Sequence, residues 1–124
     1  TSVSRGLGDV YKRQVFDTIS DNAANAGVIS GVQKNDPQKF DLRRVGSIVM
    51  RNNEVEETGL GAGVLNDPIT GIIWLVKRLS EYNQKISPGE IILSGSFIRP
   101  IEARKGDEFY ADFGDFGFVE CKFN

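Results

Sequence analysis

Two glutamates, Glu54 and Glu56, stand two positions apart in a β-prone segment. Side chains at that spacing lie on the same face of a strand, so both carboxylates could bind one hard cation such as Mg²⁺. The pair also follows directly after Asn52-Asn53, a turn signal, and the strand beyond a hairpin tip usually has a solvated polar face. The residues alone favour that solvated face over a metal site.

The chain contains no histidine, which excludes Ser-His-Asp catalysis, Cys-His catalysis and histidine-based zinc sites within it. Cys121 is its single cysteine, so no disulfide can form within the chain. Because no histidine is present to activate the thiol, we expect Cys121 to be a small buried residue of a terminal strand rather than a nucleophile. Any chemistry must then use carboxylates, Lys or Arg, hydroxyls, backbone groups or a hard metal ion.

The 124 residues include 15 basic and 17 acidic side chains, well mixed along the chain, with a net charge of −2. Nucleic-acid binding would need a clustered basic face, so we expect no nucleic-acid partner. No apolar run reaches the roughly 18 residues of a membrane span, and no signal-peptide pattern is present. We therefore expect a single-domain, cytoplasmic protein with no membrane partner.

The stretch 57–68, ETGLGAGVLNDP, separates an extended pattern from a helical one. Its glycines do not follow the G-x-G-x-x-G spacing, and no Lys-Ser/Thr pair follows them, so a phosphate-binding loop is not supported. We expect instead a strand-to-helix crossover in which Gly59, Gly61 and Gly63 allow close approach of the backbone.

A helix is predicted directly after this crossover. Asp67 is suited to the N-cap and Pro68 to the first helical position. We expect Trp74 to pack beside the helix's apolar stripe. That stripe has three- and four-residue spacing and consists of Ile69, Ile72, Ile73, Val76 and Leu79.

The rest of the chain predicts strands. The clearest pair is a hairpin formed by 45–51 and 54–58 around the Asn52-Asn53 turn. Further extended segments are expected at 28–30, 90–94, 99–103, 108–113 and 118–123. Six to eight strands with one main helix make the predicted fold class α+β and β-rich.

Six segments, taken in order, resemble the fumarylacetoacetate hydrolase superfamily, in its 2-keto-4-pentenoate hydratase branch. Together they extend over nearly all of 15–124, and their collinear order is more specific than any single motif. Within the branch, SDNAANAGV, AGVLN and GSFIRPIEARKGD are more similar to hydratases of a 2-keto-enoic dioate than to decarboxylases. The six segments are FDTISDNAA at 16–24, RNNEVEETG at 51–59, GVLNDP at 63–68, WL at 74–75, PGEIILSGS at 88–96 and ARKGD at 103–107.

The resemblance implies a mixed β-roll of the fumarylacetoacetate hydrolase C-terminal type and a homo-oligomer. It implies addition of water to a 2-oxo-hept-4-ene-1,7-dioate-like 2-keto-enoic acid in aromatic-compound catabolism, with Mg²⁺ or Mn²⁺ bound in the full-length parent. In such chemistry the metal chelates the keto acid and stabilises an enolate-like intermediate. The alternatives are a 4-oxalocrotonate-type decarboxylase, an acylpyruvate-type hydrolase, or an inactive assembly or binding module.

The first 14 residues fit none of these patterns. They have neither helical nor strand periodicity and are similar to translated adaptor sequence. We expect 1–14 to be a non-native leader and 15–124 to be the C-terminal part of a hydratase catalytic domain. The alternative is a native tail with no regular structure.

The family's metal ligands are an E-x-E pair and a third acidic residue, all upstream of the segment that 16–22 resembles. Glu54 and Glu56 match the family's hairpin instead of that pair, so we expect the metal ligands to be missing from this chain. Asp67 is a second departure, since the subgroup has a histidine before the proline.

What the resemblance carries over is one wall of the substrate pocket. Ser96 matches a hydroxyl that lines the pocket, Asp21 and Asn22 match a polar motif near it, and Arg99 and Arg104 could pair with the distal carboxylate of a dioate. The structural alternatives are a bond to its own backbone for Ser96, a local helix cap for the 21–22 pair, and a solvated surface for the arginines. No catalytic residue or general base is assigned.

Overall fold

The computed structural model describes residues 25–124. The predicted leader, 1–14, and the two candidate site residues Asp21 and Asn22 lie outside the described residues, so the predictions made for them stay predictions. None of the helices between residues 25 and 124 is long and apolar enough to cross a membrane.

The predicted hairpin is present. Strand β1 (Gly46–Arg51) pairs antiparallel with β2 (Glu54–Leu60). The turn residues Asn52 and Asn53 have φ angles of 53° and 66°, and two successive positive angles are those of a type I′ turn. Because that turn matches the right-handed twist of the strands, the two asparagines close the hairpin without strain.

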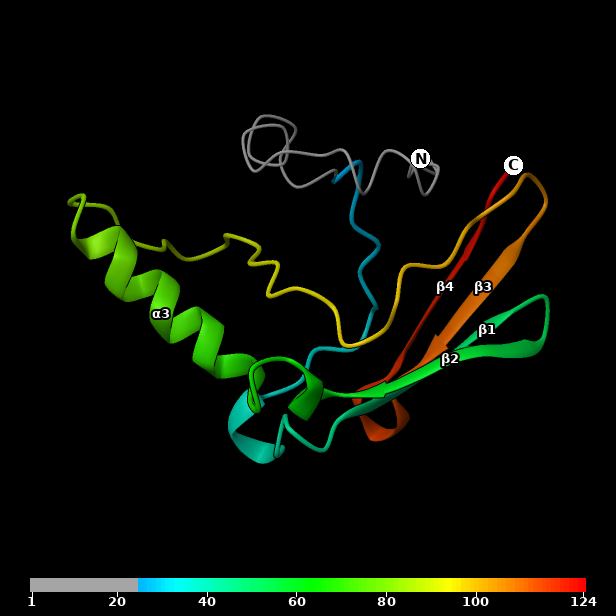
Figure 1. Ribbon diagram of the computed structural model, residues 1–124, viewed down its shortest axis with the longest axis horizontal. Helices are drawn as coiled ribbons and strands as arrows, with labels where there is room; N and C mark the ends of the chain where they lie inside the picture. The colour runs from blue at the N-terminus through cyan, green and yellow to red at the C-terminus, as the bar shows by residue number, and fades with distance from the viewer. Residues whose placement is uncertain (1–24) are drawn as a thin grey trace.

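The other two strands extend the sheet from β1. Strand β3 (Glu108–Asp112) pairs with β1, and β4 (Phe118–Lys122) pairs with β3, which gives the order β2-β1-β3-β4 with every pairing antiparallel. Figure 1 shows this twisted sheet on one side of the molecule. Cys121 lies half-buried in β4, so its predicted place in a terminal strand is confirmed.

A β-bulge interrupts the hairpin register. Val49 pairs with Glu57, but the next residue, Met50, pairs with Val55, so Glu56 has no partner of its own on β1. A bulge of this kind breaks the strict alternation of side chains along a strand. It therefore changes which acidic side chains of β2 reach a common cavity.

Helix α3 (Pro68–Ser80) begins where the sequence predicts. Asp67 is the N-cap, and its Oδ1 accepts a hydrogen bond from the Ile69 backbone N–H at 2.9 Å. Pro68 occupies the first position, where its missing N–H costs nothing. Three single-turn 3₁₀ helices complete the regular structure of residues 25–124, namely η2 (Pro37–Lys39), η3 (Gly61–Gly63) and η4 (Gly114–Phe116).

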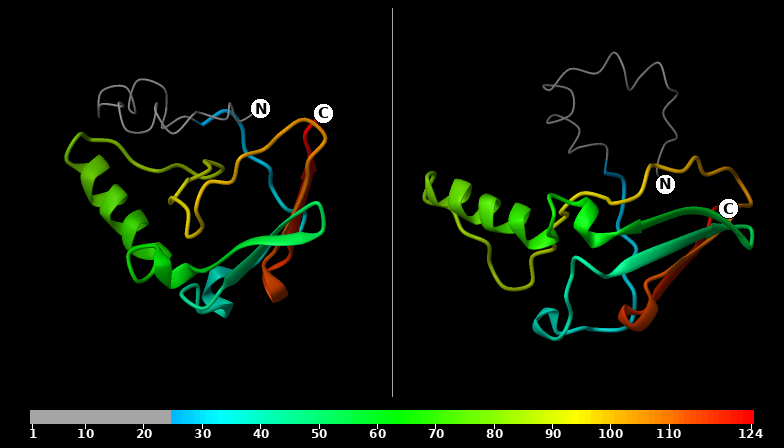
Figure 2. Two further views of the ribbon diagram at one scale, coloured as in Figure 1. Left: turned by 45° about the vertical axis from the view of Figure 1, so that its right-hand side comes forward. Right: turned by 60° about the horizontal axis from the view of Figure 1, so that its bottom comes forward.

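The helix projects away from the sheet, as Figures 1 and 2 show from several sides. No residue of α3 is buried, and Trp74 is 64% exposed. The expectation that Trp74 packs is therefore wrong for this structure, because α3 meets no second layer among residues 25–124. The buried core is correspondingly small, with Val49 and Val64 as its apolar members in the described part of the chain.

The expected strand count is also corrected. Segments 28–30, 90–94 and 99–103 form no strand, so residues 25–124 contain four strands rather than six to eight. An apolar segment becomes a strand only where a neighbour can complete its hydrogen-bond ladder, and Ile91, in the middle of 90–94, is 70% exposed. The fold class is nevertheless α+β, as predicted, with one main helix and a four-stranded sheet.

Two of the three crossover glycines are needed for close backbone approach. A Cβ on Gly59 would collide with the carbonyl oxygen of Phe97, and a Cβ on Gly61 would collide with the carbonyl oxygen of Leu42. A Cβ on Gly63 would lie an ordinary 3.5 Å from the nearest atom. The prediction is thus confirmed at the first two positions: Gly59 lets segment 94–103 lie directly against β2, and Gly61 lets the chain before β1 lie directly against the start of η3.

Candidate functional site

A cavity of about 520 Å³ lies between one face of the sheet and the segment that crosses it at 96–103. Val49, Phe109 and Cys121, from three neighbouring strands, form its sheet side. Ser96 and Arg99 belong to its other wall. The structure thus brings two of the predicted site residues to a single apolar-floored cavity.

The Ser96 side chain forms hydrogen bonds with the backbone two residues further along the chain. Its Oγ donates a hydrogen bond to the Ile98 carbonyl oxygen at 3.0 Å and accepts one from the Ile98 N–H at 3.2 Å. This is the local role set out as the structural alternative. A hydroxyl oxygen has two acceptor lone pairs, so one remains for a substrate group that donates a hydrogen bond.

Arg99 is joined to Glu57 of β2. Oε1 of Glu57 accepts a hydrogen bond from Arg99 Nε at 2.9 Å and lies 2.8 Å from Arg99 Nη2 in an ion pair. The glutamate side chain is only 20% exposed, whereas the arginine side chain is 86% exposed. The pair therefore fixes the carboxylate firmly and leaves much of the guanidinium open to solvent.

A second cavity, of about 510 Å³ and with a mostly polar lining, adjoins the first along the same segment. Glu56 and Glu57 both line it, although successive residues of a regular strand would point to opposite faces. The bulge at Glu56 accounts for this shared orientation. Glu54, the other member of the predicted E-x-E pair, is exposed and lines neither cavity.

Arg51 is the best-anchored cation of the second cavity. Its Nη2 lies 2.9 Å from Glu56 Oε1, its Nη1 donates to the Glu102 carbonyl oxygen at 3.2 Å, and its side chain is 30% exposed. Sequence reasoning did not single out Arg51. The available signal was its position at the last residue of β1, directly before the asparagine turn.

Arg104 lines the second cavity and not the first. Its Nη2 lies 3.5 Å from Glu102 Oε2, and its side chain is 75% exposed. The predicted Arg99 and Arg104 pair is therefore divided between two adjoining cavities. The Glu57–Arg99 ion pair stands between them, since Glu57 lines the second and Arg99 the first.

Asp107 closes the second cavity beside the hairpin turn. Its carboxylate accepts hydrogen bonds from Asn52 Nδ2 and from the Arg104 backbone N–H, both at 2.9 Å. These bonds hold the pKa of Asp107 below its ordinary value, the Asn52 bond contributing most. The group thus stays ionised down to lower pH than a free aspartate.

The described residues do not fit a magnesium centre. Between residues 25 and 124, no three His, Cys, Asp or Glu side chains are grouped so that they could hold one metal ion. Glu56 and Glu57 each have an arginine within 3 Å, at 2.9 and 2.8 Å. These carboxylates neutralise guanidinium groups, which leaves them poor ligands for a cation.

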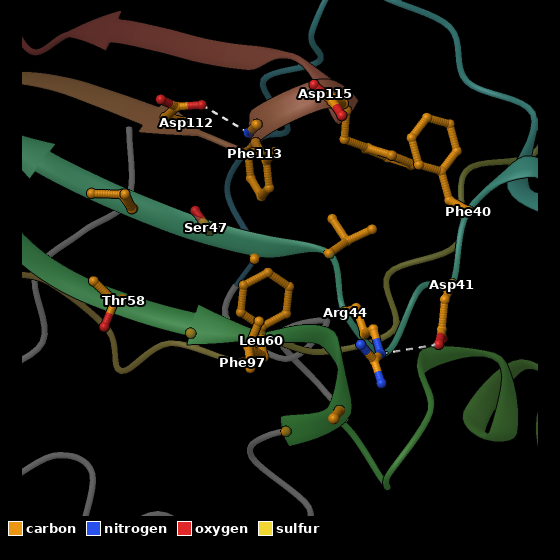
Figure 3. A pocket seen from close by; sticks show the side chains of 18 of the residues that line it. Phe40, Asp41, Arg44, Ser47, Thr58, Leu60, Phe97, Asp112, Phe113 and Asp115 are labelled. Carbon is orange, nitrogen blue, oxygen red and sulfur yellow. Dashed lines mark hydrogen bonds and ion pairs between the residues drawn. The ribbon is translucent and has the colours of Figure 1, made fainter.

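A larger cavity, about 1120 Å³, lies at the other end of the sheet beside η4, and Figure 3 shows its side chains. Four phenylalanines line it: Phe40, Phe97, Phe113 and Phe116. Ser47, also in its lining, is 4% exposed, and its buried hydroxyl has no hydrogen-bond partner in the described structure. Ser96, Arg99 and Arg104, the predicted site residues that the structure describes, do not line this cavity.

Comparison with known proteins shows which proteins this chain resembles. The chain is 52% identical over 111 residues to 2-oxo-hept-4-ene-1,7-dioate hydratase of Escherichia coli, a match that covers 90% of this chain and 42% of the relative. It is 32% identical to 2-keto-4-pentenoate hydratase of Paraburkholderia xenovorans strain LB400, over 86% of this chain and 40% of that one. No protein-family model matches the chain.

Solved structures agree with the fold. The 4-oxalocrotonate decarboxylase of Pseudomonas putida G7, complexed with magnesium and adipate, superposes with a TM-score of 0.85 at 28% identity, over 92% of this chain and 43% of that one. The same enzyme with calcium and acetate gives 0.81. This chain spans well under half the length of the relatives it matches. On this sequence and structural similarity, the chain belongs to the fumarylacetoacetate hydrolase superfamily, in its 2-keto-4-pentenoate hydratase branch.

Proposed function

We propose that this chain forms one wall of the active site in a hydratase, a hydro-lyase that adds water to a 2-oxo-hept-4-ene-1,7-dioate-like substrate in aromatic-compound catabolism. The observation that carries the proposal is the 52% identity to the E. coli hydratase over 90% of the chain. The two adjoining cavities over the sheet, which hold Ser96, Arg99 and Arg104, are the part of the site that this chain supplies.

In this proposal the apolar floor receives the carbon chain of the substrate and the arginines receive its distal carboxylate. Arg99 is the better placed, because its exposed guanidinium is oriented by Glu57 at the cavity wall. A planar guanidinium binds a carboxylate through two parallel hydrogen bonds, which favours a dioate over a monoacid. Arg104 stands one cavity further along and would meet only a longer substrate or a second orientation.

We further propose that the whole enzyme uses a divalent metal, Mg²⁺ or Mn²⁺, because the decarboxylase neighbour was solved with magnesium and with calcium. The ligands are not supplied by residues 25–124, whose carboxylates show no suitable group. When bound, such a metal polarises a keto acid. We also propose a cytoplasmic location and a homo-oligomeric assembly for the whole enzyme.

The second candidate function is decarboxylation. It is favoured by the structural neighbours, which are 4-oxalocrotonate decarboxylases with TM-scores of 0.81 and 0.85. The lower sequence identity, 28–29% against 52% for the hydratase, places it second. An acylpyruvate-type hydrolase and an inactive binding module have no specific observation in their favour.

The test is an assay of the natural protein that contains residues 15–124, purified with Mg²⁺ and given 2-oxo-hept-4-ene-1,7-dioate. If the enzyme is a hydratase, the product keeps every carbon of the substrate and is heavier by the mass of one water. Mass spectrometry of the reaction mixture measures this mass. Release of CO₂ from 4-oxalocrotonate, with no hydration of the longer dioate, would establish the decarboxylase instead. Absence of both reactions in the metal-loaded protein would reject both candidates.

A further inference from the structure

Glu57 lies on the face of the sheet that the crossing segment covers. It pairs with Val49 across the hairpin, and residues directly opposite each other in an antiparallel pair have their side chains on the same face. Val49 is buried and lines the first cavity. The Glu57 side chain is only 20% exposed, so much of it is withdrawn from solvent. A carboxylate in such a position needs a cation to neutralise it.

Arg99 is that cation, and it is not shared with another carboxylate. Its Nε donates to Glu57 Oε1 at 2.9 Å, and its Nη2 lies 2.8 Å from the same oxygen. The neighbouring Glu56 is neutralised separately, by Arg51 at 2.9 Å. Among residues 25–124, Arg99 has no other hydrogen bond or ion pair. Glu57 is therefore the one group in this part of the chain that orients the Arg99 guanidinium.

The contact leaves one edge of the guanidinium free. Glu57 faces the edge formed by Nε and Nη2. The other edge consists of Nη1 and the second N–H of Nη2, and it has no partner among the described residues. Two parallel N–H groups in one plane match the two oxygens of a carboxylate. Because Glu57 already restricts the rotation of the Arg99 side chain, less conformational entropy is lost when a carboxylate binds to that edge.

The charges of the two adjoining cavities differ in sign. Of the described residues that line the first cavity, Arg99 is the one with a formal charge. Two arginines and four carboxylates line the second cavity, so its net charge is negative. A substrate carboxylate is attracted to the first cavity and repelled by the second. The six charged residues of the second cavity are Arg51, Arg104, Glu56, Glu57, Glu102 and Asp107.

We propose that Glu57 is a positioning residue for dioate specificity. It holds Arg99 so that the free edge of the guanidinium binds the distal carboxylate of a 2-keto-enoic dioate in the first cavity. The carboxylate avoids Arg104, which lies in the negatively charged cavity. The inference rests on the proposed function for the substrate, and it adds how this chain distinguishes a dioate from a monoacid. Glu57 acts through Arg99 and touches no reacting atom.

The experiment measures binding to the natural protein that contains residues 15–124, purified with Mg²⁺. The probes are 2-oxoheptanedioate and 2-oxoheptanoate, two saturated keto acids that differ only in the distal carboxylate and have no double bond to hydrate. Calorimetry gives the Kd of each, and the ratio of the two affinities is the dioate preference. Glu57→Ala should reduce this preference ~10-fold, about the cost of one charge-assisted hydrogen bond. Glu57→Gln, whose amide oxygen can still accept from Arg99, should stay within ~3-fold of the wild type.

Two further variants show that the effect passes through Arg99. In an Arg99→Ala background, Glu57→Ala should not reduce the dioate preference further, because the group that Glu57 positions is gone. Glu81→Ala is the matched control, since it also removes a carboxylate paired with an arginine at 2.8 Å but lies outside both cavities. It should keep the wild-type preference. If Glu57→Ala fails to fold, Glu57→Thr replaces it, because threonine suits a strand and is too short to reach Arg99.

Three results would overturn the proposal. One is a wild-type protein with no preference for the dioate, and another is an unchanged preference in Glu57→Ala. The third is tighter dioate binding by both Glu57→Ala and Glu57→Gln, which would mean that Glu57 acts only as a repelling charge. Hydration of 2-oxo-hept-4-ene-1,7-dioate by the wild-type protein tests the proposed function separately. A protein that lacks this reaction but loses its dioate preference in Glu57→Ala would refute the hydratase and retain the positioning role.

Discussion

Oε1 of Glu57 accepts a hydrogen bond from Nε of Arg99 at 2.9 Å and lies 2.8 Å from Nη2 of the same guanidinium in an ion pair. One carboxylate oxygen thus orients the whole guanidinium plane. The bond links β2 to the crossing segment over 42 residues of sequence. The two cavities of the candidate site also meet at this ion pair. The contact therefore both holds the crossing segment on β2 and positions Arg99 for the proposed substrate.

The first prediction concerns substrate length in the whole enzyme. Arg99→Ala should raise the KM for a 2-keto-enoic dioate by ~10-fold, the cost of about one charge-assisted hydrogen bond. The KM for a 2-keto-enoic acid without the distal carboxylate should stay the same, because that substrate has nothing to offer the guanidinium. Steady-state kinetics with both substrates checks this.

The control for Arg99→Ala is Arg78→Ala, which removes an exposed arginine paired with Glu81 on α3 at 2.8 Å. It should change neither KM. An Arg99→Ala enzyme with an unchanged KM for the dioate would remove Arg99 from substrate binding and leave it a structural role at the surface.

The second prediction concerns the crossover glycines. Gly59→Ala places a methyl group against the Phe97 carbonyl and should lower the free energy of unfolding by ~1–3 kcal/mol, the usual cost of overpacking. Gly63→Ala, whose methyl group has 3.5 Å of room, should change it by less than ~1 kcal/mol. Urea denaturation of the two variants measures the difference, and equal stabilities would contradict the close packing of segment 94–103 on β2.

The third prediction concerns acid stability. The pKa of Asp107 is lowered in the folded chain, mainly by the Asn52 side chain, so the folded state prefers the carboxylate ionised. Its contribution to stability is full above the ordinary value of 3.8 and is lost as the pH falls through the lower folded value. The melting temperature should therefore fall at the acid end of a series of thermal unfolding curves from pH 6 to pH 3. This range extends roughly two units above and one unit below the ordinary aspartate pKa.

Asn52→Gly isolates that contribution. Glycine tolerates the φ of 53° at this position but cannot donate to Asp107 or accept from the Glu108 N–H. The thermal stability of Asn52→Gly should fall less steeply with falling pH than that of the wild type, whereas Asn53→Gly should behave like the wild type. An acid profile of Asn52→Gly that is parallel to the wild type would show that the Asn52 bond does not hold the pKa down.

Local signals explain which elements could be predicted from the sequence. The Asn52-Asn53 turn and the Asp67-Pro68 start each depend on the conformational preferences of two adjacent residues, and the structure has both. Segment 90–94 also has a strong local signal, yet it forms no strand. Its apolar composition favours burial, but a strand also needs a neighbouring strand to which it can form backbone hydrogen bonds. Among residues 25–124 this segment has no such neighbour.

The candidate site was only partly predictable for a similar reason. Ser96 and Arg99 are three residues apart in a segment of known resemblance, and they do line one cavity. Arg104 lines a different cavity from Arg99 because of the path that the crossing segment takes over the sheet, and no local sequence pattern encodes that path. The orientation of Glu56 and Glu57 depends on a bulge, and the sequence EVEE has no signature of one.

The fourth prediction concerns the start of α3. Asp67→Ala removes the acceptor for the Ile69 N–H and should destabilise the helix by ~1 kcal/mol, whereas Asp67→Asn should nearly keep its stability. Because α3 has no buried residue, the loss should appear as reduced helix content rather than as global unfolding. Far-UV circular dichroism measures it, and an unchanged helix signal in Asp67→Ala would mean that the cap contributes nothing.

The last prediction concerns metal binding by the chain itself. Titration calorimetry of the 124-residue chain with Mg²⁺ should show no stoichiometric binding, because carboxylates that already neutralise Arg51 and Arg99 would have to give up those partners. The decarboxylase of Pseudomonas putida G7, solved with magnesium, is the positive control. Stoichiometric binding that EDTA reverses would refute this prediction. If Glu56→Gln then abolished the binding, the carboxylates at the bulge would be metal ligands, and their ion pairs with arginine would have to open when the metal binds.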